Sequence, residues 1–413
     1  MNESEAERYL RSLELFGMRF GLDRMRRLMT ALDHPERRFR SIHVVGTNGK
    51  SSTSRMVAAI LTRHGLRTGA YLSPHLVSFG ERIRVDDHDL EPARFAAAVA
   101  RAARAAELVN RAAAEDDHVT QFEALTAAAY SELAEREVEV AVVEAGLGGR
   151  YDATNVLPST VQVLTSVGLE HTRWLGPTLA DIAREKLAVV KPGGTLVLGA
   201  ELDAEVAQIA EAVAAEQGAR LVRAGVDPGV AVGPPGAYQR RNFALARAVA
   251  EAFLGQLDET AVAAAAAEVR VPGRLQEIDI QPVTLLDGAH NPDGMRALVQ
   301  SLPELAERHD RLVAVVSILD DKDAAAMLRV LLPVCTEVVF TRSTSSRSLP
   351  PPTLQSLANQ LGGPPSEVMR DPVRALHRAR ILAGPGGLVI ATGSLTLVAD
   401  LLIDAQPDTA QAL

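Results

Sequence analysis

One short segment of the sequence carries the residue types that bind nucleotide phosphates. It reads GTNGKSS at positions 46–52 and lies between an apolar run and an expected helix. Glycines let backbone N–H groups approach phosphate oxygens, and the N-terminus of the following helix adds partial positive charge. Lys50 would pair with the outer phosphates, and a neighbouring hydroxyl would contact Mg²⁺. Val44 stands where the usual GxxxxGK[ST] pattern has its first glycine, so a simple glycine turn with a surface lysine is the alternative.

Lysine is scarce in this sequence, which makes the position of each lysine informative. The 43 basic residues include 39 arginines and only four lysines, Lys50, Lys186, Lys191 and Lys322. An amine can be deprotonated and modified, whereas a guanidinium stays charged. We therefore expect Lys50 and Lys186 to do chemistry that arginine could not do. For the other two lysines, chance retention is an equally good interpretation.

Composition and charge restrict the class of protein. The chain has 413 residues, 47% hydrophobic and 23% charged, which suits a globular protein of two or three domains at about 150 residues each. The polar N-terminus and the absence of long apolar runs predict neither a signal peptide nor a membrane span. A single cysteine fits a reducing cytoplasm, and the net charge of −9 argues against a nucleic-acid partner. We expect a cytoplasmic monomer that binds small molecules.

Apolar runs alternate with helical patterns through most of the chain, which is typical of parallel α/β sheets. In the first part, the strands are expected at 42–45, 68–72, 138–143, 161–165 and 195–198, and the helices at 51–64, 92–109 and 122–134. A second series of strands is expected at 283–286, 312–316, 338–340 and 388–391. An alanine-rich helix at 261–267 followed by Pro272-Gly273 indicates a hinge. We therefore predict two domains, 1–270 and 271–413.

The motifs resemble those of one known family, in the same order along the chain. The matching segments are HVVGTNGKSS at 43–52, SPHL at 73–76, ERI at 81–83, TQFE at 120–123, EAGLGGRYDATN at 144–155, EHTRWLG at 170–176, REK at 184–186, PGR at 272–274, DGAHNP at 287–292 and GSL at 393–395. The sequence resembles the Mur ligase superfamily, in particular its folylpolyglutamate synthase and dihydrofolate synthase branch. The resemblance implies a P-loop-containing, Mur-ligase-like parallel-sheet domain followed by a smaller, Rossmann-like α/β domain that serves as the glutamate-ligase domain.

This resemblance implies an ATP-dependent ligase that adds L-glutamate to dihydropteroate, to reduced folates, or to both. A carboxylate is a poor electrophile, so transfer of the γ-phosphoryl group of ATP would first form an acyl phosphate for the glutamate amine to attack. The residues implied to bind ATP are Thr47, Asn48, Gly49, Lys50, Ser51, Ser52, Asn242, Arg274 and Asp287. Two alternatives remain open: a Mur-type ligase with another carboxylate substrate, and a nucleotide-binding switch that makes no product.

Two Mg²⁺ ions are also implied by the resemblance, with Ser73, Glu144, His171 and a carbamylated Lys186 as ligands. Mg²⁺ prefers oxygen ligands. Glu144 follows an apolar strand, at the sheet edge where α/β proteins bind ligands. Carbamylation needs a neutral amine, which arginine cannot supply. Lys50, His171 and Lys186 would be the catalytic residues. Each residue alone has a structural interpretation: a loop hydroxyl, a surface acid, a satisfied histidine or a helix-surface lysine.

The resemblance assigns the pterin substrate to a further set of residues, Gln121, Phe122, Glu123, Arg150 and Asp152, with Asn155 nearby. Phe122 offers a flat face for stacking, although a core aromatic at a helix start is the equal alternative. The basic segment 24–40 either attracts anionic folates or is a solvated helix face.

Arg274 and Asp287 would bring the two domains together around ATP and exclude water from the acyl phosphate. Alternatively, Arg274 is an exposed linker charge and the DGAHNP turn caps a helix starting near Pro292. The role of His290 in that turn is open. The chain departs from the family pattern at Ser51, Gln121, Glu170 and Tyr238, where glycine, an aromatic residue, aspartate and histidine are usual.

Overall fold

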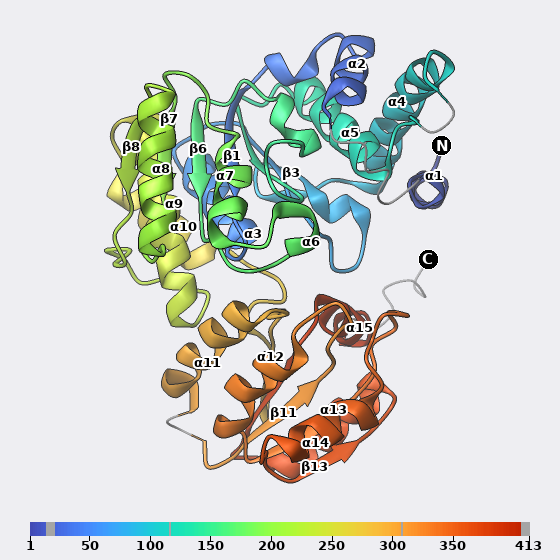
Figure 1. The fold of residues 1–413 in the computed structure, drawn as a ribbon, viewed down its shortest axis with the longest axis vertical. Coiled ribbons are helices and arrows are strands. Elements are labelled where there is room, and N and C mark those ends of the chain that lie inside the picture. Colours follow the sequence, from blue (N-terminus) through green and yellow to red (C-terminus); the bar gives the residue numbers. More distant parts are fainter. Residues whose placement is uncertain (14–20, 115–116, 307–308, 406–413) are drawn as a thin grey trace. The chain divides into compact units, whose positions relative to one another are not determined.

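The structure is a computed structural model. The residues that it describes are 1–13, 21–114, 117–306 and 309–405. The chain divides into two compact units, Met1–Gly233 with Arg241–Val269, and Pro234–Arg240 with Arg270–Leu413 (Figure 1). Each unit is built around one sheet with helices on its faces. Among the described residues, no helix has both the length and the apolar character that crossing a membrane requires.

An eight-stranded sheet forms the first unit, in the order β4-β3-β2-β5-β1-β6-β7-β8. Its strands are β1 (Arg40–Val45), β2 (Thr68–Tyr71), β3 (Ile83–Val85), β4 (His88–Asp89), β5 (Val140–Glu144), β6 (Val161–Leu164), β7 (Thr195–Leu198) and β8 (Arg220–Arg223). β3 pairs antiparallel with both β2 and β4, and the other strand pairs of this sheet are parallel. β5 is buried along its whole length, which explains its run of valine and alanine. The parallel order brings the carboxyl ends of β1, β2, β5 and β6 to one edge of the sheet.

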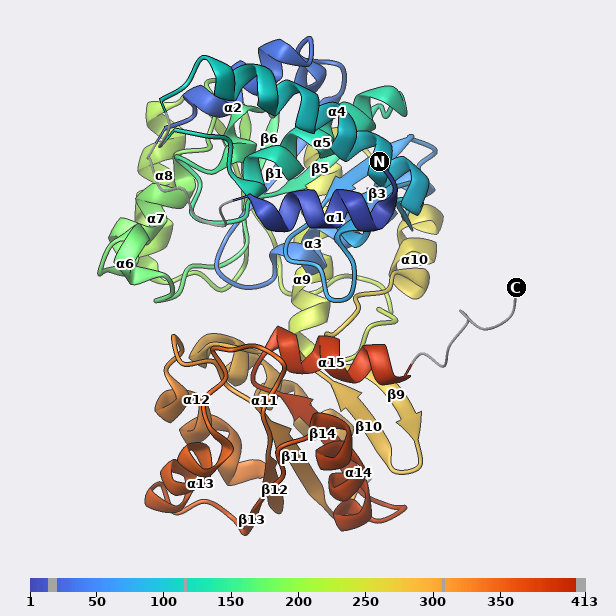
Figure 2. The same ribbon diagram turned by 90° about the vertical axis from the view of Figure 1, so that its right-hand side faces the viewer.

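Helices of the first unit form two apolar layers with the sheet. One layer packs together α1 (Glu3–Ser12), α2 (Asp23–Ala31), α4 (Pro92–Arg111) and α5 (Gln121–Glu135), as Figure 2 shows. Helix α5 of this layer contacts β2. The other packs α7 (Leu179–Leu187) and α8 (Ala204–Glu216) against β6 and β7. The remaining helices of this unit are α3 (Lys50–Arg63), α6 (Thr172–Leu175) and α10 (Glu259–Glu268), with 3-10 turns η1 (Pro35–Arg37), η2 (Phe79–Arg82) and η3 (Ala153–Val156). Helix α9 (Ala237–Leu254) begins in the second unit and continues into the first.

The second unit contains a six-stranded sheet in the order β13-β12-β11-β14-β10-β9. Its strands are β9 (Gln276–Ile280), β10 (Val283–Leu286), β11 (Leu312–Val316), β12 (Glu337–Phe340), β13 (Ser366–Val368) and β14 (Leu388–Thr392). Only the β9–β10 pair is antiparallel among these strands. The helices are α11 (Pro292–Ala306), α12 (Ala324–Leu331), α13 (Pro351–Gln360), α14 (Pro372–Ala383) and α15 (Leu395–Ala405), with the turn η4 (Leu332–Val334).

The two-part α/β fold class expected from the sequence is confirmed, and each strand expected from an apolar run is present. The prediction from the sequence did not include β8, β9, β13 or the β3–β4 hairpin. β8, β9, β13 and β4 are partly exposed along their length, so they lack the continuous apolar run that marks a buried strand. The basic segment 24–40 is not a uniformly solvated face, because Arg24 is only 7% exposed.

Candidate active site

The phosphate-loop motif connects the carboxyl end of β1 to the first residue of α3. Gly46 and Gly49 have φ values of 155° and 84°. A Cβ on Gly46 would lie 1.9 Å from the Thr165 hydroxyl, and one on Gly49 would lie 2.8 Å from the Asn242 side-chain oxygen. Both positions therefore require glycine. Because Gly49 has no side chain to cap α3, the N–H groups in the first turn of this helix form the kind of site that binds phosphate.

Residues that follow β6 hold the phosphate loop in place. The backbone N–H of Asn48 donates to the Ser166 hydroxyl at 2.9 Å, and its carbonyl accepts from the Thr165 hydroxyl at 2.7 Å. The Thr47 N–H donates to the Ser166 carbonyl at 2.8 Å. The Lys50 Nζ lies 3.1 Å from the Thr47 carbonyl, which keeps the ammonium beside the loop. The sequence prediction did not include Thr165 and Ser166, although their position directly after a parallel strand is the signal that finds them.

Lys186 lies on α7 and is only 4% exposed. Its Nζ donates a hydrogen bond to the Gly46 carbonyl at 2.8 Å, so a lysine more than a hundred residues away in sequence contacts the phosphate loop. Burial, and then the charge of Lys50, lower the pKa of Lys186 to about 7, although Glu170 and other acids oppose the shift. About half of the amine is therefore neutral at pH 7. Burial thus favours the neutral form of Lys186, which carbamylation needs.

Glu144 is the last residue of β5 and is 1% exposed, so it is not a surface acid. Its Oε1 accepts from the Ser51 hydroxyl at 3.0 Å, and its Oε2 accepts from the Ser73 N–H at 3.1 Å. The Ser51 hydroxyl also lies 3.2 Å from the Ser73 carbonyl. The first turn of α3 and the segment after β2 therefore meet at one buried carboxylate.

This group of oxygen atoms fits a magnesium ion. Among the described residues, no three His, Cys, Asp or Glu side chains form a ready metal cluster. Mg²⁺ does not need such a cage, because it is usually held by one or two carboxylates, water and substrate phosphates. Glu144 provides such a carboxylate, and the Ser51 hydroxyl and the Ser73 carbonyl add two neutral oxygen atoms beside it. His171 is exposed and is the N-cap residue of α6, where it has a left-handed φ of 53°.

An aromatic pair lies at the start of α5. The ring of Phe122 stacks on Tyr71, the last residue of β2, with 6.2 Å between the ring centroids and 28° between the planes. The backbone of Gly146 packs against the same ring, since a Cβ there would lie 2.6 Å from it. Gln121 donates its side-chain amide to the Leu10 carbonyl at 2.8 Å. The sequence prediction did not include Tyr71 among the site residues. Its position at the carboxyl end of β2 is the feature that could have indicated it.

Two of the acids assigned to the substrate have their oxygens engaged within the protein. Asp152 accepts from the Leu147 N–H at 2.8 Å and from the Thr154 N–H at 3.0 Å and hydroxyl, so it shapes the turn after β5. Burial raises the pKa of Asp152, although these hydrogen bonds oppose the shift. Glu123 is held in the same way by Thr120 and Arg24.

Two other residues assigned to the substrate lie nearer the surface. Arg150 is exposed and pairs with Glu185 at 3.2 Å. Asn155 donates its side-chain amide to the Arg150 carbonyl at 3.1 Å, and its oxygen accepts from Lys191. The Arg150 guanidinium is therefore exposed, whereas Glu123 and Asp152 are each only 6% exposed.

In the second unit, Asp287 follows β10 and organises the DGAHNP turn. Its Oδ2 accepts from the Tyr238 hydroxyl at 2.6 Å and the Leu275 N–H at 3.0 Å, and its Oδ1 accepts from the Ala289 N–H at 2.8 Å. The helix cap of α11 comes from Asn291, whose side chain accepts from the Gly294 N–H. His290 bonds to the Gly288 carbonyl through Nδ1. Asp287 therefore orders this turn, while Asn291 caps the helix.

Arg274 lies beside this turn in the same unit. A Cβ on Gly288 would come within 2.9 Å of the Arg274 guanidinium, and the residue is half-buried. Arg274 is therefore not a freely solvated linker charge.

Comparison with known proteins identifies the family. The chain matches the Mur ligase middle domain over residues 44–242 and the Mur ligase glutamate ligase domain over residues 273–395. It is 36% identical to the dihydrofolate synthase/folylpolyglutamate synthase of Mycobacterium tuberculosis over 384 residues, covering 83% of this chain and 78% of the relative. The chain belongs to the folylpolyglutamate synthase/dihydrofolate synthase family. The resemblance seen in the motifs is thereby confirmed.

Solved structures of this family agree with the fold along nearly the whole chain. M. tuberculosis folylpolyglutamate synthase complexed with ADP aligns with a TM-score of 0.90 at 32% identity, covering 98% of both chains. Escherichia coli FolC in complex with DHPP and ADP aligns with a TM-score of 0.85 at 29% identity, also over 98% of both chains. Members of the family therefore bind adenine nucleotides on this fold.

Proposed function

We propose that this protein joins L-glutamate to dihydropteroate and to reduced folates, using ATP and Mg²⁺ and passing through an acyl phosphate. Its family consists of ATP-dependent glutamate ligases. The observation that carries the proposal is the buried amine of Lys186 against the phosphate loop. A nucleotide switch that makes no product would not require an amine with a lowered pKa beside Lys50.

The phosphate loop would position the γ-phosphoryl group of ATP for transfer to the acceptor carboxylate. The first-turn N–H groups of α3 would hold the phosphates, and Lys50 would neutralise the charge that develops on the outer oxygens. The acceptor carboxylate would attack the γ-phosphorus, and ADP would leave. The glutamate amine would then attack the acyl carbon through a tetrahedral intermediate and displace phosphate.

Ser51, Ser73 and Glu144 would hold one Mg²⁺, and Lys186 would hold a second as a carbamate. The neutral Lys186 amine would attack CO₂, so that an N–C bond forms and one proton leaves to solvent. When bound, the metal ions supply charge neutralisation for phosphoryl transfer. A family member from Yersinia pestis has been solved with AMPPNP and a Mn ion, which supports a divalent cation beside the nucleotide. His171, at the N-terminus of α6, would be a further ligand.

The acceptor would lie against the aromatic pair at the start of α5. Phe122 would stack on the pterin, and the exposed Arg150 would attract the anionic part of the substrate. Glu123 and Asp152 would shape this site, because their oxygens accept hydrogen bonds that order the start of α5 and the turn after β5.

A product assay tests the proposal. Purified protein with ATP, Mg²⁺ and L-glutamate is given dihydropteroate, tetrahydrofolate or a UDP-muramyl acceptor, and products are identified by mass. We expect a glutamyl adduct on one or both pterin acceptors. An adduct on the UDP-muramyl acceptor alone would indicate a different Mur-type ligase. Bound ATP with no amide product would indicate a switch.

A further inference from the structure

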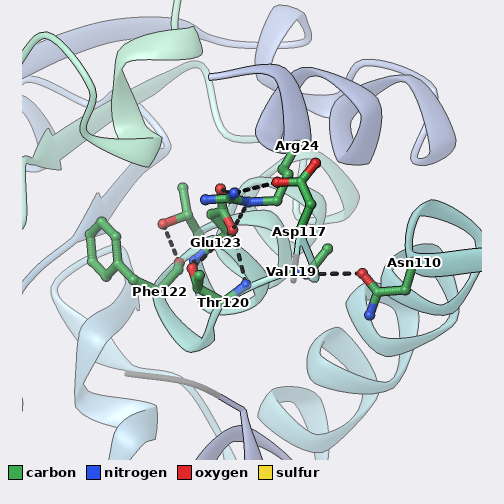
Figure 3. Close-up of polar contacts among 8 residues, drawn as sticks. Arg24, Asn110, Asp117, Val119, Thr120, Phe122 and Glu123 are labelled. Carbon is green, nitrogen blue, oxygen red and sulfur yellow. Dashed lines mark hydrogen bonds and ion pairs between the residues drawn. The ribbon is translucent and has the colours of Figure 1, made fainter. Parts of the chain in front are cut away.

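A buried arginine links helix α2 to the start of α5. Arg24 is 7% exposed and lies between two acidic side chains (Figure 3). Its Nε lies 3.0 Å from both carboxylate oxygens of Glu123, and its Nη1 lies 2.7 Å from Asp117 Oδ1. Although burial alone would lower the pKa of Arg24, its hydrogen bonds and charge interactions with these two acids raise it. The guanidinium therefore stays charged in this position.

The partner carboxylate is part of the cap of α5. Glu123 Oε2 accepts from the N–H and the hydroxyl of Thr120, both at 2.9 Å, and the Glu123 N–H donates back to the Thr120 hydroxyl at 3.3 Å. This reciprocal arrangement is a capping box, which fixes the first turn of a helix. With Arg24 on its other side, Glu123 is 6% exposed. Glu123 thus connects Arg24 to the geometry of that turn.

The same turn carries the aromatic ring of the candidate acceptor site. In Figure 3 the Phe122 ring points away from the Arg24–Glu123 ion pair, so the side chains of Phe122 and Glu123 leave the turn in opposite directions. The ring stacks on Tyr71 and packs on Gly146, and the Phe122 carbonyl accepts from the Thr126 hydroxyl at 2.7 Å. A shift of the turn would therefore move the ring relative to the segment after β5.

We propose that Arg24 is a positioning residue for the acceptor site, acting through Glu123 on the turn that presents Phe122. This inference rests on the proposed function, which places the pterin at Phe122. Removal of one partner from a buried ion pair leaves an uncompensated charge, and the remaining carboxylate then rearranges toward water. Rearrangement of Glu123 would break the capping box and loosen the ring. The effect would fall on binding of the acceptor and not on binding of ATP.

The chain offers a matched control for a buried ion pair on the same helix. Arg101 of α4 lies 2.5 Å from the carboxylate of Glu132, which is 1% exposed. Glu132 lies ten residues after Phe122 on α5, or about 15 Å along the helix axis. Arg101→Gln therefore removes an ion pair between helices without touching the first turn, and Arg94, 3.6 Å from Glu132, remains as the partner of that carboxylate. This variant therefore distinguishes a loss of protein stability from a displacement of the Phe122 ring.

The test compares Arg24→Gln, Arg24→Lys and Arg101→Gln with the unmodified protein. For each, KM for the pterin acceptor, KM for ATP, kcat and the melting temperature are measured. We expect Arg24→Gln to raise the acceptor KM by roughly tenfold while KM for ATP stays within about twofold. Arg24→Lys retains the charge and should recover part of the loss. Arg101→Gln should lower the melting temperature but keep the acceptor KM.

Hydrogen exchange gives a second readout that needs no turnover. We expect faster exchange at the Glu123 amide in Arg24→Gln and unchanged exchange there in Arg101→Gln. An unchanged acceptor KM in Arg24→Gln, or an equal rise in Arg101→Gln, would overturn the inference. If Arg24→Gln does not fold, the acceptor KM of Arg24→Lys decides in the same way. Absence of product from the unmodified protein would instead overturn the proposed function, and this inference with it.

Discussion

Lys186 makes a quantitative prediction about carbamylation. Its pKa of about 7 leaves roughly half of the amine neutral at pH 7, whereas an ordinary lysine at 10.5 is neutral in only about 0.03% of molecules. The fraction able to attack CO₂ is therefore higher by roughly a thousandfold. Protonation increases as pH falls below 7, so carbamylation should decline there and recover when bicarbonate is added.

The perturbation is Lys186→Arg, with Lys191→Arg as the matched control. Burial also lowers the pKa of Lys191, which is half-buried, but its Nζ donates to the side chain and carbonyl of Asn155. We expect Lys186→Arg to lose glutamate-dependent ADP release by about a thousandfold or more while ATP still binds. Lys191→Arg should stay near the unmodified rate.

The assay measures ADP release in CO₂-free buffer and in buffer with bicarbonate, and ¹³C NMR of protein kept under labelled CO₂. We expect a carbamate resonance that disappears in Lys186→Arg and persists in Lys191→Arg. Near-normal turnover by Lys186→Arg would refute the reasoning. So would full activity in CO₂-free buffer without any carbamate signal.

Three further predictions concern the loop, the metal and acid stability. Gly49→Ala should weaken ATP binding measured by calorimetry, because the new Cβ would lie against Asn242. The control is Gly65→Ala, at a φ of 83° with no described atom within 4 Å of the added Cβ. It should cost a similar backbone strain of roughly 1 kcal/mol but leave ATP binding unchanged. Glu144→Gln should raise the Mg²⁺ concentration for half-maximal activity by about tenfold or more, and an unchanged Mg²⁺ titration would contradict its role as a ligand. Burial, and then Lys191, lower the pKa of His43 to about 3, so the unfolded chain binds more protons between pH 6.5 and 3. As the pH falls through that window, the free energy of unfolding should decrease by up to about 1.4 kcal/mol per pH unit. Urea titrations at several pH values should show a weaker dependence of this free energy on pH for His43→Gln.

The parts of the fold that could be predicted from the sequence are those in which burial decides the residue type. β1, β5 and β11 are buried strands and read as apolar runs, so their positions follow from the sequence. β8 and β13 lie at sheet edges and contain both polar and apolar residues. Hydrogen bonding to the neighbouring strand stabilises them, and the sequence does not show which strand that neighbour is.

The candidate site was predictable to the extent that each residue lies near a strand end. Glu144 and Gly49 have that position, and the structure places them as expected. Glu123 shows the opposite case, because the pattern Thr-x-x-Glu at 120–123 is also a capping box. Its partner Arg24 lies 99 residues away, and only the packing of α2 on α5 brings the two together.

The acyl phosphate is the central claim, and the path of one oxygen atom tests it most directly. Dihydropteroate labelled with ¹⁸O in its carboxylate is incubated with the protein, ATP, Mg²⁺ and L-glutamate. Attack of the carboxylate on the γ-phosphorus transfers one of its oxygens to phosphate when the amine displaces it. The account predicts one ¹⁸O atom in each released inorganic phosphate, detected by mass. Amide product accompanied by unlabelled phosphate would contradict it.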